Sequence, residues 1–293
     1  MMNGILNINK PKGMTSFDVV KKVKSICNMK RVGHTGTLDP GASGVLPICI
    51  GRATKLVDYI MEGSKTYVAT LKLGVVTDTY DKYGKIVFES NLDVNEKEII
   101  DSIMSFKGNI SQIPPMYSAL KVNGKRLYEL ARKGIKVERK TRNITIYSID
   151  ILKVDLPYVK FEVKCSKGTY IRSLCHDIGQ KLGCGGTMWE LLRTHSGGFD
   201  ISDSISVLDL NEVNVFQHLI PMDMALEGYP CVHIEDNFKK HVLNGLPIKS
   251  NKFLNKIEKD VLYRVYIDKN KFIGIGMNKK GTGFKMKKLL ISG

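Results

Sequence analysis

The chain has 293 residues, 43% hydrophobic and 25% charged, so it is long enough for two domains with a sizeable core. Lysine and arginine number 45 against 29 acidic residues, and the resulting formal net charge of +16 indicates a polyanionic partner, either nucleic acid or an acidic membrane surface. We find no apolar run of membrane-helix length, no secretory signal pattern, no Cys-x-x-Cys pair and no histidine cluster, which argues against a membrane protein, a disulfide scaffold and a metal site.

The first half of the chain mixes strand and helix patterns. It opens with residues that alternate between apolar and polar and end in a Pro-Lys-Gly turn, followed by helical spacing with Ser16 as the expected N-cap. A glycine-rich loop follows at 33–44. The expected elements of this half are strands at 4–9, 65–79 and 86–90 and helices at 17–29 and 94–108.

The second half continues the mixture. A turn at Val122-Asn123-Gly124 precedes a short basic helix that stops at Gly134. The later elements are expected as strands at 143–155 and 158–174 and a helix at 175–183. Strands often follow strands, which favours an α+β fold around a mixed or mostly antiparallel sheet.

A domain boundary is expected near residue 228. We divide the chain into a large domain at 1–228, which includes a basic segment at 118–142, and a small domain at 229–293. The small domain is predicted to hold one helix at 236–245 and several short strands with a basic face, because its last 25 residues contain seven lysines and no acid.

Asp39 stands between Leu38 and Pro40 in the loop GHTGTLDPGASG. Asp-Pro-Gly is favourable turn chemistry, so a purely structural turn is one interpretation. The glycines around it also leave the backbone open to close approach by a ligand, which is typical of a functional loop. The loop lacks the Gly-Lys-Ser/Thr of a Walker motif and the G-x-G-x-x-G of a dinucleotide-binding turn, which argues against an ATPase or a dehydrogenase.

Four stretches in one order resemble motifs of the TruB family of tRNA pseudouridine synthases. Together they span most of residues 4–200, which makes the resemblance far more specific than a lone motif. The stretches are GHTGTLDPGASGVLPICIGRATK (33–55), KTYVATLKLGVVTDTYDKYG (65–84), QIPPMYSALKVNGKRLYELARKG (112–134) and KGTYIRSLCHDIGQKLGCGG (167–186). The resemblance implies isomerisation of uridine 55 in the tRNA T-loop to pseudouridine, a reaction that needs no cofactor and no metal.

The resemblance also implies roles for individual residues. Asp39 would be the nucleophile after base flipping, and sequence leaves open whether it attacks the base or acts at the ribose. Arg172 would pair with Asp39, lower its pKa and orient it. Tyr67 would stack on the target base, although a tyrosine on an alternating strand is, taken alone, usually a core or cross-strand packing residue.

The remaining pocket residues implied by the resemblance are Tyr170, Leu191 and His34. Tyr170 and Leu191 would form an aromatic and an aliphatic wall, and His34 would lie beside the flipped nucleotide. Taken alone, Leu191 is typical of a core residue, and His34 of a histidine bonded within its own loop. The sequence departs from the family pattern at Leu192, where a basic residue is usual, and at Thr187, where some relatives have histidine.

The basic segment at 118–142 resembles the family's thumb, whose charges would contact phosphates. Some of these charged side chains would only solvate a helix face. The thumb candidates are Lys121, Arg126, Arg132, Lys136 and Arg139. The C-terminal domain resembles, more weakly, a PUA-type RNA-binding module that would support the tRNA acceptor arm. We expect a cytoplasmic monomer without an obligatory protein partner. The alternatives are a non-catalytic RNA-binding or RNA-folding protein of the same fold and a guide-RNA-dependent pseudouridine synthase subunit.

Overall fold

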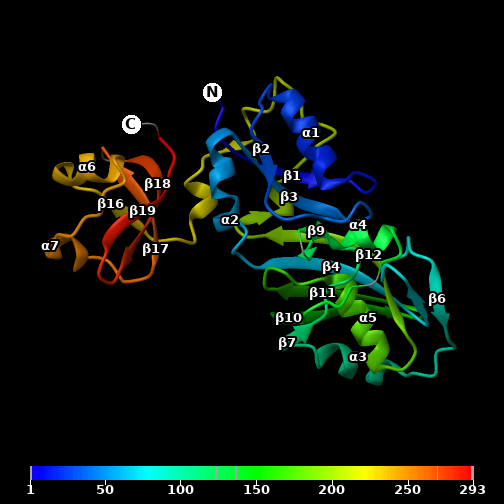
Figure 1. Cartoon of the computed structure of the whole chain (residues 1–293). Coiled ribbons are helices and arrows are strands. Elements are labelled where there is room, and N and C mark those ends of the chain that lie inside the picture. The colour runs from blue at the N-terminus through cyan, green and yellow to red at the C-terminus, as the bar shows by residue number, and fades with distance from the viewer. Residues whose placement is uncertain (1, 123, 136, 269, 292–293) are drawn as a thin grey trace.

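The computed structural model describes residues 2–122, 124–135, 137–268 and 270–291, and it contains a large and a small β-sheet (Figure 1). Within these residues the large sheet has 11 strands, and only the β1–β14 and β3–β12 pairs are parallel. The predicted α+β class with a mixed, mostly antiparallel sheet is confirmed. The strands of the large sheet are β1 (Gly4–Lys10), β2 (Val32–His34), β3 (Ser43–Ile50), β4 (Lys65–Leu73), β7 (Gly108–Gln112), β10 (Arg142–Asp155), β11 (Tyr158–Cys165), β12 (Gly186–Ser196), β13 (Phe199–Asp200), β14 (Ile205–Ser206) and β15 (Leu219–Ile220).

Strand β4 lies in the interior of the large sheet, between β12 and β11. Its residues alternate strictly between buried and half-buried, as expected for a strand with one face against a core. Tyr67 on the buried face is aligned with Arg193 of β12 and with Val163 of β11. On its other side β12 runs parallel to β3, where Arg193 is aligned with Gly44. The residues before and after the Asp39 loop are therefore fixed to the same sheet as Tyr67.

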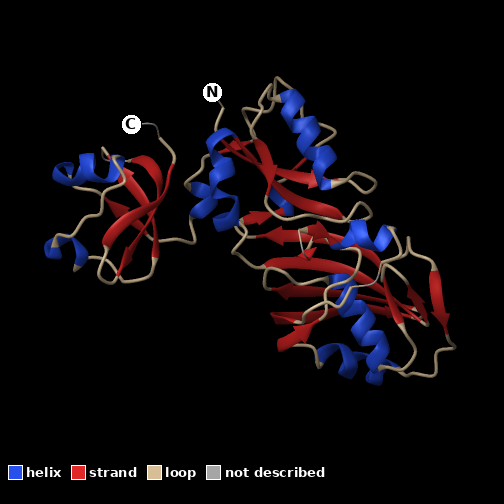
Figure 2. Ribbon diagram, viewed as in Figure 1, coloured by secondary structure: helices blue, strands red, loops and turns tan. Residues whose placement is uncertain are grey.

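Two helices cover one face of this sheet. Figure 2 shows α3 and α5 side by side, and α5 packs on β12 and β4 while α3 packs on β10. Buried apolar side chains between sheet and helices form the main core, which includes Leu71, Phe161 and Ile178. The helices of this part are α1 (Ser16–Ile26), α2 (Val57–Ile60), α3 (Glu96–Met104), α4 (Leu127–Arg132) and α5 (Ile171–Lys181), with 3-10 turns η1 (Gly51–Leu56), η2 (Ile201–Asp203) and η3 (Met224–Leu226).

The N-cap of α1 is Thr15, so the prediction of Ser16 as the cap is wrong. Thr15 accepts the backbone N–H of Asp18, and the Asp18 carboxylate accepts the backbone N–H of Thr15, which completes a capping box. Ser16 is instead buried. Its hydroxyl accepts a hydrogen bond from the backbone N–H of Leu38 (2.9 Å) and donates one to the Leu38 carbonyl (3.1 Å), which fixes the residue before Asp39.

The predicted strand at 158–174 is too long. Strand β11 ends at Cys165, Gly168 adopts a left-handed φ of 82°, and α5 begins at Ile171. Ile171, Leu174 and Ile178 are buried at helical spacing, and this spacing outweighs the local alternation that suggests a strand. Arg172 therefore projects from the first turn of a helix.

Two hairpins lie outside the large sheet. They comprise β5 (Val75–Thr77) with β6 (Ile86–Glu89), and β8 (Lys121–Val122) with β9 (Lys125–Arg126). The second hairpin matches the turn predicted around Gly124, although Asn123 itself lies outside the described residues. Helix α4 follows it directly, as predicted for the basic helix that stops before Gly134.

The C-terminal part folds on its own four-stranded sheet. Its elements are β16 (Cys231–His233), α6 (Asp236–Leu243), α7 (Asn251–Leu254), β17 (Leu262–Ile267), β18 (Lys271–Lys279) and β19 (Gly283–Leu289). The small β domain is confirmed, but the prediction of a single helix is wrong, because α7 is too short to show a helical period in sequence. Lys285, Lys287 and Lys288 on β19 are exposed, in line with the expected basic face.

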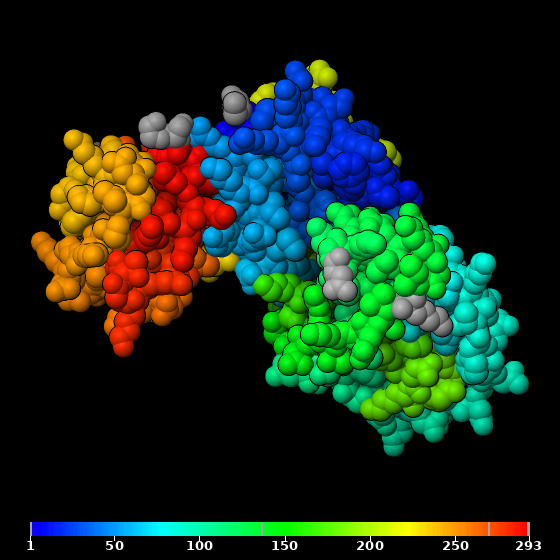
Figure 3. Space-filling model, viewed as in Figure 1, coloured from blue at the N-terminus to red at the C-terminus, as the bar shows by residue number. Residues whose placement is uncertain are grey.

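Figure 3 shows the C-terminal part as a lobe beside the N-terminal residues. The two parts are joined by side chains of η1: Arg52 Nη1 donates to the Leu290 carbonyl (2.6 Å) and Lys55 Nζ to that of Leu289 (3.2 Å). Ile275 and Leu290 also share a core cluster with Val45 and Leu56. Among the described helices, none combines the length and the apolar character that a membrane crossing requires. The exact domain boundary near 228 stays a prediction.

Candidate active site

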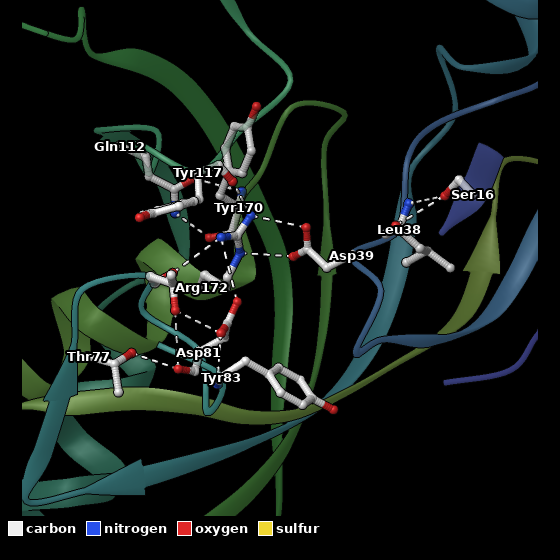
Figure 4. Close-up of polar contacts among 11 residues, drawn as sticks. Ser16, Leu38, Asp39, Thr77, Asp81, Tyr83, Gln112, Tyr117, Tyr170 and Arg172 are labelled. Carbon is white, nitrogen blue, oxygen red and sulfur yellow. Dashed lines mark hydrogen bonds and ion pairs between the residues drawn. The ribbon is translucent and has the colours of Figure 1, made fainter. Parts of the chain in front are cut away.

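Asp39 occupies a tight turn that is held from several sides. The backbone N–H of Ala42 donates to the Asp39 carbonyl (3.0 Å), as in a β-turn, and that of Gly13 donates to the Pro40 carbonyl (2.8 Å). Ser16 holds Leu38 (Figure 4). The predicted turn is therefore present, and it presents a side chain that keeps 34% of its surface exposed. A carboxylate fixed in this way is accessible to a bound molecule.

A buried lysine lies beneath the turn, and sequence analysis does not single it out. Lys10 is fully buried at the end of β1, and its ammonium donates to the carbonyls of Pro11 (2.9 Å), Met14 (2.7 Å) and Pro40 (3.4 Å). Burial lowers the pKa of Lys10 to about 8, and the opposite charge of Asp39 limits that decrease. Lys10 thus joins the turn to β1.

Arg172 holds the Asp39 carboxylate at two points. Arg172 Nε lies 2.9 Å from Asp39 Oδ2, and Nη2 donates to Oδ1 over 3.1 Å. The guanidinium also donates to the carbonyls of Thr79 (3.2 Å) and Tyr117 (2.8 Å), and only 6% of the side chain is exposed. A two-point contact from a buried planar cation fixes both the charge and the orientation of the carboxylate. The predicted Asp39–Arg172 pair is present.

A second carboxylate contacts the same arginine. Asp81 Oδ2 lies 3.7 Å from Arg172 Nη1, while Asp81 Oδ1 accepts the Thr79 hydroxyl (2.8 Å) and the backbone N–H of Tyr83 (3.0 Å). Asp81 is not among the site residues expected from the sequence. The pattern Thr79-x-Asp81 shortly before Gly84 indicates a turn, but it does not reveal that the acid meets an arginine 91 residues later.

The surroundings of Asp39 act on its protonation in opposite directions. Burial raises the pKa of Asp39 above its ordinary value, Arg172 opposes this change, and the negative charge of Asp81 adds to it. Because a third of the side chain remains exposed, water still moderates the effect of burial. Arg172 lowers the pKa of Asp39 as expected, but burial outweighs it and the net change in the pKa is upward.

Tyr67 is buried beside an arginine that sequence analysis also missed. Arg193 is 1% exposed, and it donates from Nε to the Val45 carbonyl (2.7 Å) and from Nη2 to the Gly36 carbonyl (3.2 Å). Burial raises the pKa of Tyr67, while Arg193 lowers it and Asp39 raises it slightly. The phenol is therefore protonated at neutral pH and close enough to Asp39 to sense its charge.

The other predicted pocket residues lie on three different elements. Tyr170 caps α5, where its backbone N–H donates to Gln112 Oε1 (2.8 Å), and burial raises the pKa of its phenol. Leu191 is 6% exposed on β12, aligned with Ala69. His34 ends β2, and its Nδ1 is buried with no hydrogen-bond partner among the described residues. Burial and then Arg193 lower the pKa of His34, so its ring is neutral at neutral pH.

The thumb candidates do not share one environment. Arg126 and Arg132 are exposed and lie over the Tyr128 ring, at 5.9 and 5.5 Å from its centroid. Lys121 is exposed on β8, whereas Arg139 is half-buried and donates to the Pro114 carbonyl (3.0 Å). Lys136 lies outside the described residues.

The two departures from the family pattern have structural positions. Thr187 is buried and its hydroxyl donates to the Val75 carbonyl (2.8 Å), and Leu192 is half-buried on β12, aligned with Val68 of β4. Neither contacts Asp39 in any recorded interaction. Among the described residues, no three His, Cys, Asp or Glu side chains gather in a way that could hold a metal ion.

Two family models match consecutive parts of the chain. "TruB family pseudouridylate synthase (N terminal domain)" matches residues 24–171, and "tRNA pseudouridylate synthase B C-terminal domain" matches residues 172–227. Proteins named tRNA pseudouridine synthase B from Clostridium kluyveri and Clostridium acetobutylicum are 61% and 55% identical to this chain. Each alignment covers 99% of this chain and 100% of the relative.

Solved structures extend the comparison. The chain is similar to one in the "Crystal Structure of a Cbf5-Nop10-Gar1 Complex" with a TM-score of 0.76 and 30% identity, over 99% of this chain and 85% of that one. A chain in the "Structure of H/ACA RNP bound to a substrate RNA containing 2'-deoxyuridine" gives a TM-score of 0.74 and 28% identity, over 98% and 85%. The motifs that meet around Asp39 and the similarity over the full length lead to one conclusion: the chain belongs to the TruB family of pseudouridylate synthases.

Proposed function

We propose that this protein isomerises uridine 55 in the T-loop of tRNA to pseudouridine. The observation that carries the proposal is the Asp39 carboxylate, one third exposed in a fixed turn and held at two points by the buried Arg172. Full-length relatives named tRNA pseudouridine synthase B support the choice of substrate.

The reaction breaks the bond from C1′ of the ribose to N1 of uracil and forms one from C1′ to C5. The proton lost from C5 is balanced by the proton gained at N1, so the change is an isomerisation without oxidant or reductant. Asp39 in its ionised form is the nucleophile, and Arg172 keeps its carboxylate oriented toward the nucleotide. No cofactor is needed for this balance.

The pocket residues act on the extruded nucleotide. Extrusion costs a few kcal/mol of stacking, and a planar neutral side chain such as His34 offsets part of that cost by filling the space beside the base. Tyr67 offers an aromatic surface to the uracil, and its protonated phenol is available for proton movement at the ribose. Tyr170 and Leu191 complete the walls.

The thumb and the C-terminal domain hold the rest of the tRNA. Exposed cations of the thumb contact phosphates, and the basic face of β19 supports the acceptor arm. The six cysteines are all free thiols, which fits a reducing cytoplasm as the compartment. We further propose that the protein acts as a monomer without guide RNA, because the thumb hairpin and α4 supply an RNA grip of their own.

The test is to incubate the purified protein alone with unmodified tRNA and to map pseudouridine by carbodiimide treatment and reverse-transcription stops. We expect one stop, at the T-loop uridine, and none with Asp39→Asn. tRNA binding without modification would favour the non-catalytic alternative. Modification that requires an added guide RNA or partner protein would favour the guide-RNA-dependent alternative.

A further inference from the structure

Four side chains form a continuous row that starts beside the Asp39 turn. Tyr83 and Trp189 are separated by the ammonium group of Lys82, which lies 5.6 Å from the Tyr83 ring centroid and 5.9 Å from that of Trp189. Lys72 lies over the Trp189 ring at 4.6 Å. We name these four residues the aromatic–lysine strip. Each neighbouring pair is an aromatic ring with a cation.

The strip is attached to the catalytic loop. The Tyr83 ring packs so closely on Gly41 that a methyl group at Gly41 would overlap it. The backbone N–H of Tyr83 donates to Asp81 Oδ1, and Asp81 contacts Arg172. Figure 4 shows Tyr83 and Asp81 on one side of Arg172 and Tyr117, which leads into the thumb, on the other. Tyr83, the end of the strip next to the catalytic loop, therefore lies across Arg172 from Tyr117.

The ring of Tyr83 is unusually open for an aromatic side chain, since 66% of the residue is exposed. Trp189, in contrast, is half-buried, with Lys72 over its face and Tyr158 tilted against it at 5.8 Å. Tyr83 is thus the free stacking surface. Trp189 holds two ammonium groups at defined positions.

The charges along the strip are arranged around one acid. Glu190 Oε1 lies 2.8 Å from Lys12 Nζ, just outside the strip, and 3.7 Å from Lys82 Nζ. Neither of these two ion pairs involves Lys72. The three lysines Lys12, Lys72 and Lys82 outnumber the single carboxylate of Glu190, so this surface is positive. Glu190 competes with any anion that approaches Lys12 or Lys82.

We propose that the aromatic–lysine strip binds the RNA strand next to the target uridine, with a nucleobase stacked on Tyr83 and phosphates at Lys82 and Lys72. A row of rings and cations is the arrangement that binds unpaired nucleotides, because every base has a stacking face and every linkage carries a negative charge. An acidic protein partner would use the lysines but would gain little from an exposed ring. The proposal rests on the proposed function for its substrate.

The experiment measures tRNA binding in the Asp39→Asn background, so that turnover does not interfere. Tyr83→Ala should weaken binding by about tenfold, the effect of losing one base–aromatic stack, and Tyr83→Trp should restore it. Lys72→Gln and Lys82→Gln should each reduce the slope of log affinity against log salt by about one. Glu190→Gln should tighten binding at low salt, an effect that a merely structural ion pair would not give.

Matched controls lie on the neighbouring strands. Tyr147→Ala removes another exposed tyrosine (49% exposed), and Lys160→Gln removes an exposed lysine for which no ring contact is recorded; both should leave affinity and salt slope unchanged. Equal melting temperatures would show that each variant is folded. If Tyr83→Ala binds within twofold of its parent, or if Tyr147→Ala weakens binding as much, the proposal is wrong.

The two proposals fail separately. A protein that forms pseudouridine but binds tRNA independently of Tyr83 and Glu190 would refute the strip and leave the proposed function intact. A protein that binds tRNA through Tyr83 but modifies no uridine would support the strip and refute the function. A protein that binds no tRNA at all would refute both.

Discussion

Tyr80 stacks face to face on His176, with ring centroids 3.9 Å apart and 9° between the ring planes. Tyr80 has a left-handed φ of 62°, which is uncommon for a residue with a side chain, and it directly precedes Asp81. His176 lies one helical turn after Arg172 on α5. The same helix thus holds the arginine and, through the stack, the loop that carries the second carboxylate.

We expect His176→Ala to reduce kcat by about tenfold with little change in KM. Losing the stack releases Tyr80 from its strained conformation and lets Asp81 move away from Arg172, and small misplacements near reacting groups are costly. His176→Phe keeps a flat ring and should retain most of the rate. Steady-state kinetics on T-loop RNA provide the measurement. Equal losses in the alanine and phenylalanine variants would contradict a role for stacking.

Asp39→Asn should abolish turnover and leave tRNA affinity within about tenfold, because phosphate contacts carry binding. Asparagine has nearly the same shape and can still accept from Arg172, so the fold should persist. Filter binding and pseudouridine mapping on one preparation give both values. Retained turnover with a large loss of affinity would refute the assigned role.

Activity should fall in acid at a pH above the ordinary carboxyl pKa of 3.8. Burial raises the pKa of Asp39, and only the ionised carboxylate is a nucleophile, so kcat/KM decreases as the pH drops through that raised pKa. Asp81→Asn removes a charge that also raises the pKa of Asp39, and it should move the acid limb to lower pH. Asp155→Asn, at an exposed ion pair with Lys153, should leave the limb in place. An acid limb at or below 3.8 in the unaltered protein would contradict this assignment.

Arg193→Met should lower the free energy of unfolding by about 2–4 kcal/mol, because the buried carbonyl of Val45 and the carbonyl of Gly36 lose their donors. Leu192→Met, a volume-conserving change at the neighbouring position, should cost less than about 1.5 kcal/mol. Urea denaturation followed by circular dichroism compares the two. Equal stability of both variants would show that Arg193 is not needed to hold the Asp39 loop.

Replacing Arg126 and Arg132 together with glutamine should weaken tRNA binding and reduce its salt slope by about two, since both cations are exposed on the thumb. Arg139→Gln provides a contrast, because its guanidinium is bound to the Pro114 carbonyl. We expect that variant to melt at a lower temperature with an unchanged slope. Salt titrations of all three proteins distinguish phosphate contacts from internal hydrogen bonds.

Local chemistry in the sequence predicts much of this fold. The alternation along β4 and the turn at Asp39 depend only on residues adjacent in the sequence, and both are present in the structure. The cap of α1 is misassigned because Thr15 and Ser16 are both good caps, and only the burial of Ser16 against Leu38 separates them.

Contacts between distant segments are harder to predict. Arg172 and Asp39 are 133 residues apart, and only the family resemblance links them before the fold is known. Asp81 lies within the matched stretch at 65–84 and Arg193 lies outside all four stretches, and the resemblance gave neither residue a role. The contacts that involve them appear only when β12, β4 and α5 pack together. A buried arginine on an alternating strand looks like a solvent-facing one in sequence.

Arg172 has a further consequence through its hydrogen bond to Tyr117. That carbonyl belongs to the residue just before the predicted thumb, so one guanidinium joins the start of this segment to the Asp39 carboxylate. The two features therefore share a single anchor, and a substitution at Arg172 would release both at once.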